Sequence, residues 1–67
     1  MVIKVRIVPE NKEVEVRGGN RRVRELLKEL GLSLEEAVVV KNGRVVLDDE
    51  VVKDGESVEV LLAVSGG

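Results

Sequence analysis

The sequence predicts an α+β protein, in which one helix packs on one face of a mixed sheet of four to five strands. Three observations support this fold class. Segments in which apolar and charged residues alternate, typical of half-buried strands, lie before and after a single segment with helical periodicity. An Asn-Gly pair separates two valine-rich runs and marks a hairpin. The length of 67 residues suits one small domain.

The first two strands are predicted from alternation. Residues Val2–Val8 place both isoleucines and Val5 on one face and the basic side chains on the other. Residues Lys12–Val16 alternate in the same way. A turn over Pro9–Lys12 joins them, because proline fixes one dihedral angle and asparagine tolerates unusual ones. The two segments together predict a hairpin.

The single helix is predicted to begin after Asn20 and to end near Leu30. Asn20 can act as the N-cap, since its side-chain oxygen can accept a hydrogen bond from a free N–H group of the first turn. Gly31 can follow the helix in the left-handed conformation. A spacing of i, i+3, i+4 and i+7 gives one apolar stripe that would face the sheet, made of Val23, Leu26, Leu27 and Leu30.

The second half of the chain is predicted to add three strands. Asn42 and Gly43 favour a type I′ turn within the hairpin Val38–Val46, because both central residues of that turn need positive φ. An irregular span, Leu47–Glu56, leads to the last strand, Ser57–Val64. Alternation in that strand turns Val58, Val60 and Leu62 toward the helix and leaves Glu59, Leu61 and Ala63 on the opposite face.

Two strands, one helix and three further strands fit a β-grasp fold. In this fold the first and last strands lie side by side and parallel in the middle of the sheet. Strands rather than a second helix follow the helix, which argues against a ferredoxin-like split βαβ arrangement. We therefore expect a β-grasp domain over residues 1–64 and a flexible Ser-Gly-Gly tail over residues 65–67.

The composition excludes several kinds of active site. The chain contains no cysteine and no histidine, so it lacks a thiolate nucleophile, a zinc–thiolate site and the commonest general base. Three acids in a row, Asp48, Asp49 and Glu50, are interpreted as a polar turn rather than a metal site, because they lack further ligands. We therefore expect no metal and no bound cofactor.

The surface charge argues against direct contact with nucleic acid. The net charge is −2, and no aromatic residue is present to stack on bases. Four arginines gather around the predicted helix start, and a solvated helix end is the favoured interpretation, with steering toward an acidic partner as the alternative. They are Arg17, Arg21, Arg22 and Arg24. The mixed charges predict a monomer.

No segment predicts contact with a membrane. The chain has no apolar stretch long enough to span one and no basic-then-apolar signal peptide. We therefore expect a cytoplasmic protein.

The two final glycines, Gly66 and Gly67, need an explanation. Glycine packs poorly at the end of a strand and loses much backbone freedom when it is ordered. Because glycine has no Cβ, the pair suits a thin end whose carboxylate enters another protein's active site. Ser65 to Gly67 can span roughly 10 Å when extended. The alternative is that these small residues are a frayed end without a role.

Three segments together resemble a known family. These segments are "VRELLKELGL", "VVVKNGRVV" and "VKDGESVEVLLAVSGG". Their order and spacing are similar to those of the ThiS/MoaD group of ubiquitin-like sulfur carriers, over nearly the whole chain. The segment "NKEVEV" and the ending Val-Ser-Gly-Gly look most like the branch that serves tRNA 2-thiouridine synthesis. The branch that supplies sulfur for the thiazole of thiamine is nearly as similar.

This resemblance implies a carrier rather than an enzyme. An E1-like enzyme would use ATP to adenylate the carboxylate of Gly67, and a persulfide sulfur would displace AMP to leave a thiocarboxylate. The implied partners are that E1-like enzyme, a sulfurtransferase or persulfide donor, and a sulfur-accepting synthase or tRNA thiolase. The acceptor stays open between tRNA, thiazole and pterin.

Two other functions stay open beside the sulfur carrier. Some members of the family are joined to lysines of other proteins through the C-terminal glycine, so this chain could be a protein modifier. The chain could also be a β-grasp binding module with an idle tail.

A docking surface is predicted on the sheet face opposite the helix. Leu61 and Ala63, with Val2 and Val8 on the neighbouring strand, would form an apolar patch near the tail. The alternative is that these side chains are scattered on the surface and have no common role.

Overall fold

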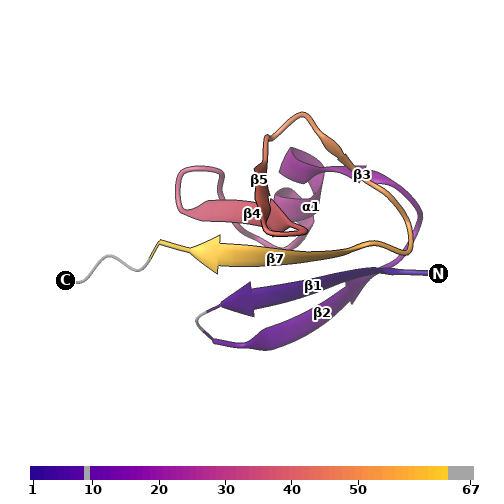
Figure 1. The fold of residues 1–67 in the computed structure, drawn as a ribbon, viewed down its shortest axis with the longest axis horizontal. Helices are drawn as coiled ribbons and strands as arrows, with labels where there is room; N and C mark the ends of the chain where they lie inside the picture. The colour runs from indigo at the N-terminus through magenta and orange to yellow at the C-terminus, as the bar shows by residue number, and fades with distance from the viewer. Residues whose placement is uncertain (9, 64–67) are drawn as a thin grey trace.

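The structure, a computed structural model, describes residues 1–8 and 10–63. One helix covers a five-stranded sheet with the strand order β2-β1-β7-β4-β5, and two further strands form a separate pair, β3-β6. The predicted α+β class and β-grasp arrangement are confirmed (Figure 1). The elements in chain order are β1 (Ile3–Val8), β2 (Lys12–Val16), β3 (Arg21–Arg22), α1 (Val23–Glu29), β4 (Ala37–Lys41), β5 (Arg44–Val46), β6 (Val51–Val52) and β7 (Ser57–Leu62).

The first and last strands lie side by side in the middle of the sheet. β1 and β7 are parallel, with Val5 opposite Val58 and Ile7 opposite Val60. On its other side β7 pairs antiparallel with β4, where Val39 faces Val60. Figure 1 shows β7 between β1 and β4, with its carboxyl end at the same side of the sheet as the end of β1.

The core is a layer of aliphatic side chains between the helix and the sheet. Leu26 and Leu27 of α1 are at most 1% exposed, and Ile3, Val5 and Val60 of the sheet are completely buried. Each such side chain contributes roughly 1.5–3 kcal/mol when it is fully removed from water. The predicted apolar stripe is thus confirmed, and its last member, at position 30, packs partly buried against the core.

The prediction that Asn20 caps the helix is wrong. The helix begins at Val23, and Arg22 is its N-cap residue. Arg21 and Arg22 are extended because they pair with β6, so the helix can start only after them. The side-chain oxygen of Asn20 instead accepts a hydrogen bond from the N–H of Asp54, at 2.9 Å.

The helix ends as the sequence predicts. Gly31 has a φ of +75°, in the left-handed region that glycine adopts without strain. The N–H of Gly31 donates to the carbonyl of Lys28 at 3.0 Å, and the N–H of Leu32 donates to Leu27 at 2.8 Å. These two bonds form a Schellman motif, which pairs carbonyl groups that the helix end would leave free.

The hairpin between β4 and β5 is also confirmed. Asn42 and Gly43 have φ values of 54° and 76°, as a type I′ turn requires. The following span, predicted to be irregular, contains the short strand β6. Two residues are too few to show alternation, so no local pattern could predict it.

Candidate functional site

The helix covers one face of the main sheet, and the opposite face is open. On this open face Leu61 of β7 has Val8 of β1 as its register partner on one side and Val38 of β4 on the other. Leu61 and Val38 are 42% and 44% exposed. Residues in register on neighbouring strands point to the same face, so the three side chains form a continuous line. We call Val8, Leu61 and Val38 the apolar row.

The predicted docking residues are exposed, as the alternation requires. Leu61 lies in the middle of the apolar row, and Ala63 follows it two residues later on the same side of the chain, also exposed. Val8 is half-buried and lies beside Leu61 in the apolar row. Val2 is not part of this patch, because it lies at the other end of the sheet, where its carbonyl accepts a hydrogen bond from the N–H of Gly55 at 3.1 Å. The prediction that Val2 belongs to the patch is therefore wrong.

The sequence interpretation missed Val38 as a member of the patch. Val38 and Val40 alternate with the buried Val39, which is a signal for the open face. That signal says which face a residue occupies, but the pairing of Val38 with Leu61 depends on the register between strands more than twenty residues apart in the sequence.

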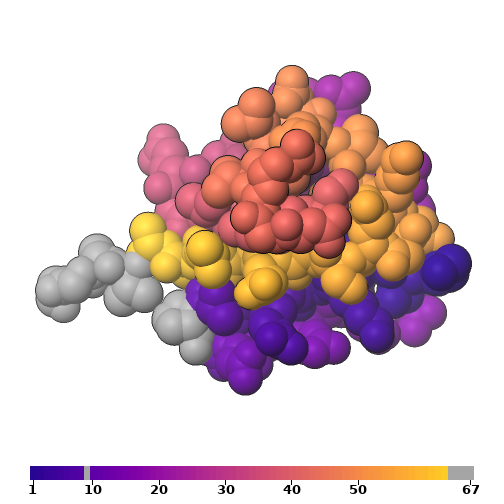
Figure 2. Space-filling model, viewed as in Figure 1, coloured from indigo at the N-terminus to yellow at the C-terminus, as the bar shows by residue number. Residues whose placement is uncertain are grey.

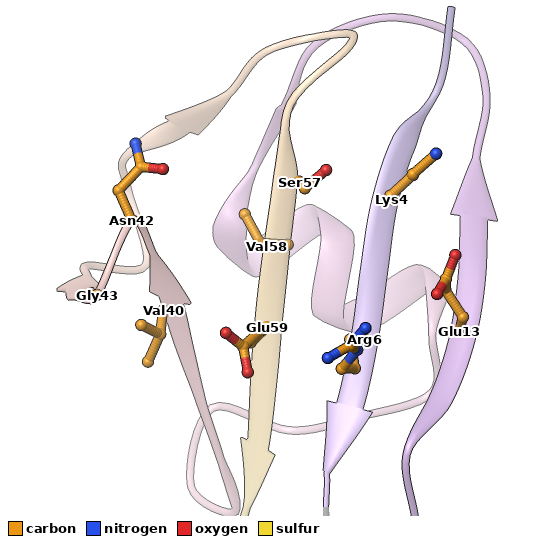
Figure 3. A pocket seen from close by; sticks show the side chains of 9 residues that line it. All are labelled: Lys4, Arg6, Glu13, Val40, Asn42, Gly43, Ser57, Val58 and Glu59. Carbon is orange, nitrogen blue, oxygen red and sulfur yellow. The ribbon is translucent and has the colours of Figure 1, made fainter.

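A charged hollow adjoins the apolar row on the open face. In register, Arg6 lies between Glu13 of β2 and Glu59 of β7, and Lys4 lies beside Ser57. Figure 3 shows these side chains over the sheet, with Asn42 and Gly43 at the far edge and the helix behind. The hollow has a volume of about 450 Å³ and is lined by Lys4, Arg6, Glu13, Val40, Asn42, Gly43, Ser57, Val58 and Glu59. The open face therefore has an apolar part next to a part of mixed charge.

The acidic run of residues 48–50 has a structural role. The carbonyls of Glu50 and Asp48 accept from the first helical N–H groups, those of Val23 and Arg24, at 2.9 and 3.0 Å. The side chain of Glu50 accepts from the N–H of Leu47. This turn satisfies N–H groups that a helix start leaves free. Within residues 1–8 and 10–63, no group of three acidic side chains is placed to hold a metal ion.

One of the four arginines is committed to the fold. The guanidinium of Arg21 donates to the carbonyls of Arg17, Gly18, Gly19 and Asn20, and to the carboxylate of Glu29. It therefore closes the loop between β2 and β3. Arg22 and Arg24 are exposed, as a solvated helix end predicts.

One carboxylate has a shifted pKa. The N–H of Lys53 donates to Glu56 at 2.7 Å, and the ammonium of Lys41 lies 3.3 Å from the other carboxylate oxygen. The hydrogen bond from Lys53, and then the interaction with Lys41, hold the pKa of Glu56 below its usual value of 4.5. This group links two turns and lies away from the apolar row.

The carboxyl end of β7 lies at the surface, next to the end of β1. Figure 2 shows this end of the strand in yellow, exposed at one pole of the molecule. Ala63 is the last residue that the structure describes, and its N–H donates to the carbonyl of Glu36 at 2.7 Å. The predicted tail residues Ser65, Gly66 and Gly67 lie outside the described residues. The described part of the chain contains no helix long and apolar enough to cross a membrane.

The order of the strands, the single helix and the open sheet face together define a ubiquitin-like β-grasp protein. A solved ThiS, a thiamine biosynthesis protein from Geobacter metallireducens, is 34% identical, with a TM-score of 0.68 over 100% of both chains. A computationally designed protein based on human erythrocytic ubiquitin has a TM-score of 0.69 at 21% identity, over 98% of this chain and 95% of its own. At that identity the second likeness shows the fold alone.

The chain belongs to the family described as small archaeal modifier protein 2, which matches residues 1–64. The sulfur carrier protein TtuB of Thermus thermophilus is 47% identical over 60 residues, which cover 90% of this chain and 91% of TtuB. An uncharacterized protein of Archaeoglobus fulgidus is 41% identical over 68 residues and the full length of both chains. The resemblance to ubiquitin-like sulfur carriers is thus confirmed, and TtuB is named as a carrier rather than as an enzyme.

Proposed function

We propose that this protein is a sulfur carrier whose reactive group is the carboxylate of Gly67. The single observation that carries the proposal is the 47% identity to the sulfur carrier TtuB over 90% of the chain. The likeness to ThiS over the full chain supports the same role. The carrier would bind no cofactor of its own, and ATP would be used by a partner enzyme.

The chemistry explains why such a carrier needs a partner. A carboxylate is a poor electrophile, so a Gly67 oxygen first attacks the α-phosphate of ATP, and pyrophosphate leaves. A persulfide sulfur then attacks the carbonyl carbon and AMP leaves, which is a covalent activation strategy. A second thiol reduces the resulting acyl disulfide, and the thiocarboxylate remains. The partner supplies the groups that catalyse these steps and holds the reactants together, which accounts for much of the rate.

The folded body would serve as the handle in these reactions. The apolar row lies beside the carboxyl end of β7, so a partner that covers Leu61 and Ala63 sits close to the residues that follow. We propose this open face as the docking surface for an E1-like adenylating enzyme and for the enzyme that accepts the sulfur. Exposed apolar groups with a polar surround are typical of such surfaces. The need for ATP favours the cytoplasm as the compartment.

Intact-mass measurement tests the carrier function directly. The protein is incubated with an E1-like enzyme from the same genome, ATP and a persulfide donor, and we expect one oxygen to be replaced by one sulfur. A variant without Gly67 is the control and should keep its mass. If the intact protein keeps its mass while the enzyme activates another carrier, the proposal is wrong.

Transfer of sulfur to tRNA is the proposed pathway. TtuB shares more identity with this chain than ThiS does, at 47% against 34%. The thiocarboxylate form is offered in parallel to a tRNA thiolase and to a thiazole synthase, and sulfur is followed into each product. We expect transfer by the thiolase. Transfer by the synthase alone would place the protein in thiamine synthesis.

A second candidate function is the modification of other proteins. The match to the small archaeal modifier protein 2 family over residues 1–64 favours it. Ligation through the terminal glycine would leave residues 54–67 attached to target lysines after trypsin digestion, because Lys53 is the last basic residue of the chain. Mass spectrometry of digested cell extract would detect this remnant. A binding module with an idle tail would instead keep its function after removal of Gly66 and Gly67.

A further inference from the structure

The last described residue, Ala63, is tied to the loop that precedes β4. The distance of 2.7 Å between its nitrogen and the oxygen of Glu36 makes this a short backbone hydrogen bond. Ala37 is the register partner of Leu62, so the bond extends the pairing of β4 and β7 by one residue. Leu62 is partly buried and packs against the core. The end of β7 is therefore held by its backbone and by a side chain.

The loop that supplies the carbonyl is itself ordered. The N–H of Glu35 donates to the hydroxyl oxygen of Ser33 at 3.0 Å, and the N–H of Glu36 donates to the carbonyl of Ser33 at 3.2 Å. Leu32, just before this turn, packs against the core. Local bonds of this kind fix a turn whose side chains are exposed. The carbonyl of Glu36 thus has a defined place just before the start of β4.

We propose that the hydrogen bond from Ala63 N–H to Glu36 C=O, which we name the exit clamp, is a positioning contact for the reactive end of the chain. This inference rests on the proposed function of Gly67. Four residues follow Ala63 in the sequence, and they can span at most roughly 14 Å. The exit clamp fixes the position of Ala63, from which these four residues extend, relative to Leu61 in the docking surface.

The expected effect follows from the sensitivity of reactions to orientation. A displacement of the reacting group by about 1 Å can lower a rate by a factor on the order of a hundred. Loss of the clamp leaves the apolar row intact, so a partner still binds the carrier. The loss should therefore lower kcat for adenylation of the carrier, with little change in KM for the carrier.

Two substitutions at position 63 separate the effect of losing the N–H donor from the effect of changing the side chain. Ala63→Pro removes the N–H group, whereas Ala63→Ser changes the same exposed side chain and keeps the donor. Adenylation of each carrier variant is measured as the exchange of labelled pyrophosphate into ATP, catalysed by the E1-like enzyme. We expect kcat of the proline variant to be roughly tenfold below that of the serine variant, with KM values within about twofold. Equal kcat values, or a difference confined to KM, would overturn the clamp.

A third variant tests the clamp without touching the last strand. Ser33→Ala removes the hydroxyl oxygen that accepts from Glu35. We expect faster hydrogen exchange of the Ala63 amide and a kcat reduced by roughly twofold. Thermal unfolding of each variant shows whether the domain remains folded. A Ser33 variant with faster exchange of this amide and unchanged kcat would contradict a positioning role.

Amide exchange separates this inference from the proposed function. If the wild-type protein is not adenylated by an active enzyme, the carrier function is wrong. The clamp is then judged by the Ala63 amide alone, which must exchange more slowly than the same amide in the Ser33 variant. An unprotected Ala63 amide in an active carrier would refute the clamp and leave the carrier function intact.

Discussion

The guanidinium of Arg21 donates through Nε to the carboxylate of Glu29, with 2.6 Å between the two atoms. This contact joins the residue before the helix N-cap to the last residue of α1. The remaining donors of Arg21 bind carbonyls of the loop that follows β2. The planar guanidinium can satisfy several acceptors at fixed angles, which an ammonium group does not reproduce.

Replacement of Arg21 should destabilise the fold more than replacement of an exposed arginine. We expect Arg21→Ala to lower the free energy of unfolding by about 1–2 kcal/mol, since several hydrogen bonds to a charged donor are lost near the surface. Arg21→Lys should restore only part of the loss. Urea unfolding measures both, with Arg24→Ala as the control at an exposed helix position. Equal losses for Arg21→Ala and Arg24→Ala would show that the loop contacts contribute nothing.

A charge in the middle of the apolar row should weaken docking. Leu61→Lys places an ammonium group between Val8 and Val38, and we expect KM for the carrier in adenylation to rise roughly tenfold or more. Leu47→Lys is the matched control, because Leu47 is 65% exposed and lies outside the row. Unfolding curves should show that both variants are folded. A similar KM for both variants would show that the open face is not the docking surface.

The hairpin turn should tolerate asparagine better than alanine at position 43. Gly43 has a φ of +76°, and a Cβ there would meet no atom within 4 Å, so the cost of a side chain is conformational. We expect Gly43→Ala to lower the free energy of unfolding by about 1–2 kcal/mol, and Gly43→Asn to lower it by less. Thermal or urea unfolding measures the difference. If the alanine variant equals the wild type, this turn does not depend on left-handed backbone.

The contribution of the Glu56 carboxylate to the free energy of unfolding should be lost in acid. Its pKa is lower in the folded protein than the usual value of 4.5, so the carboxylate stabilises the fold above that value and stops doing so as the pH falls through the folded pKa. We expect Glu56→Gln to be less stable than the wild type at pH 7 and to approach its stability at an acidic pH below the folded pKa of Glu56. Urea unfolding at several pH values gives the two curves. Glu10→Gln, the same change at an exposed position, controls for net charge.

A difference between Glu56→Gln and the wild type that is the same at both pH values would contradict this account. It would mean that the glutamine loses packing or hydrogen bonding that does not depend on ionisation. Because the carboxylate is solvent-accessible, salt should also reduce the part that comes from Lys41.

Short-range patterns in the sequence predicted most of the fold. Each of these features depends on residues that lie only a few positions apart in the sequence: the alternation in β1, β2 and β7, the apolar stripe of α1 and the Asn42-Gly43 turn. Such features are set by side-chain periodicity and by allowed backbone angles, which act locally. The carrier function does not follow from such local rules; it is what the resemblance of three sequence segments, the last ending in Gly66 and Gly67, implies.

Other features were decided only by the tertiary structure. The pairing of Arg21–Arg22 with Val51–Val52 extends the chain before the helix and moves the N-cap from the predicted Asn20 to Arg22, so that the helix begins at Val23. The apolar row needs Val8, Leu61 and Val38 to fall in register on three strands. Both depend on contacts between segments far apart in the sequence. The sequence by itself determined which face each residue occupies, but register and long-range pairing decided which residues meet, because a shift of one residue between strands would exchange the two faces.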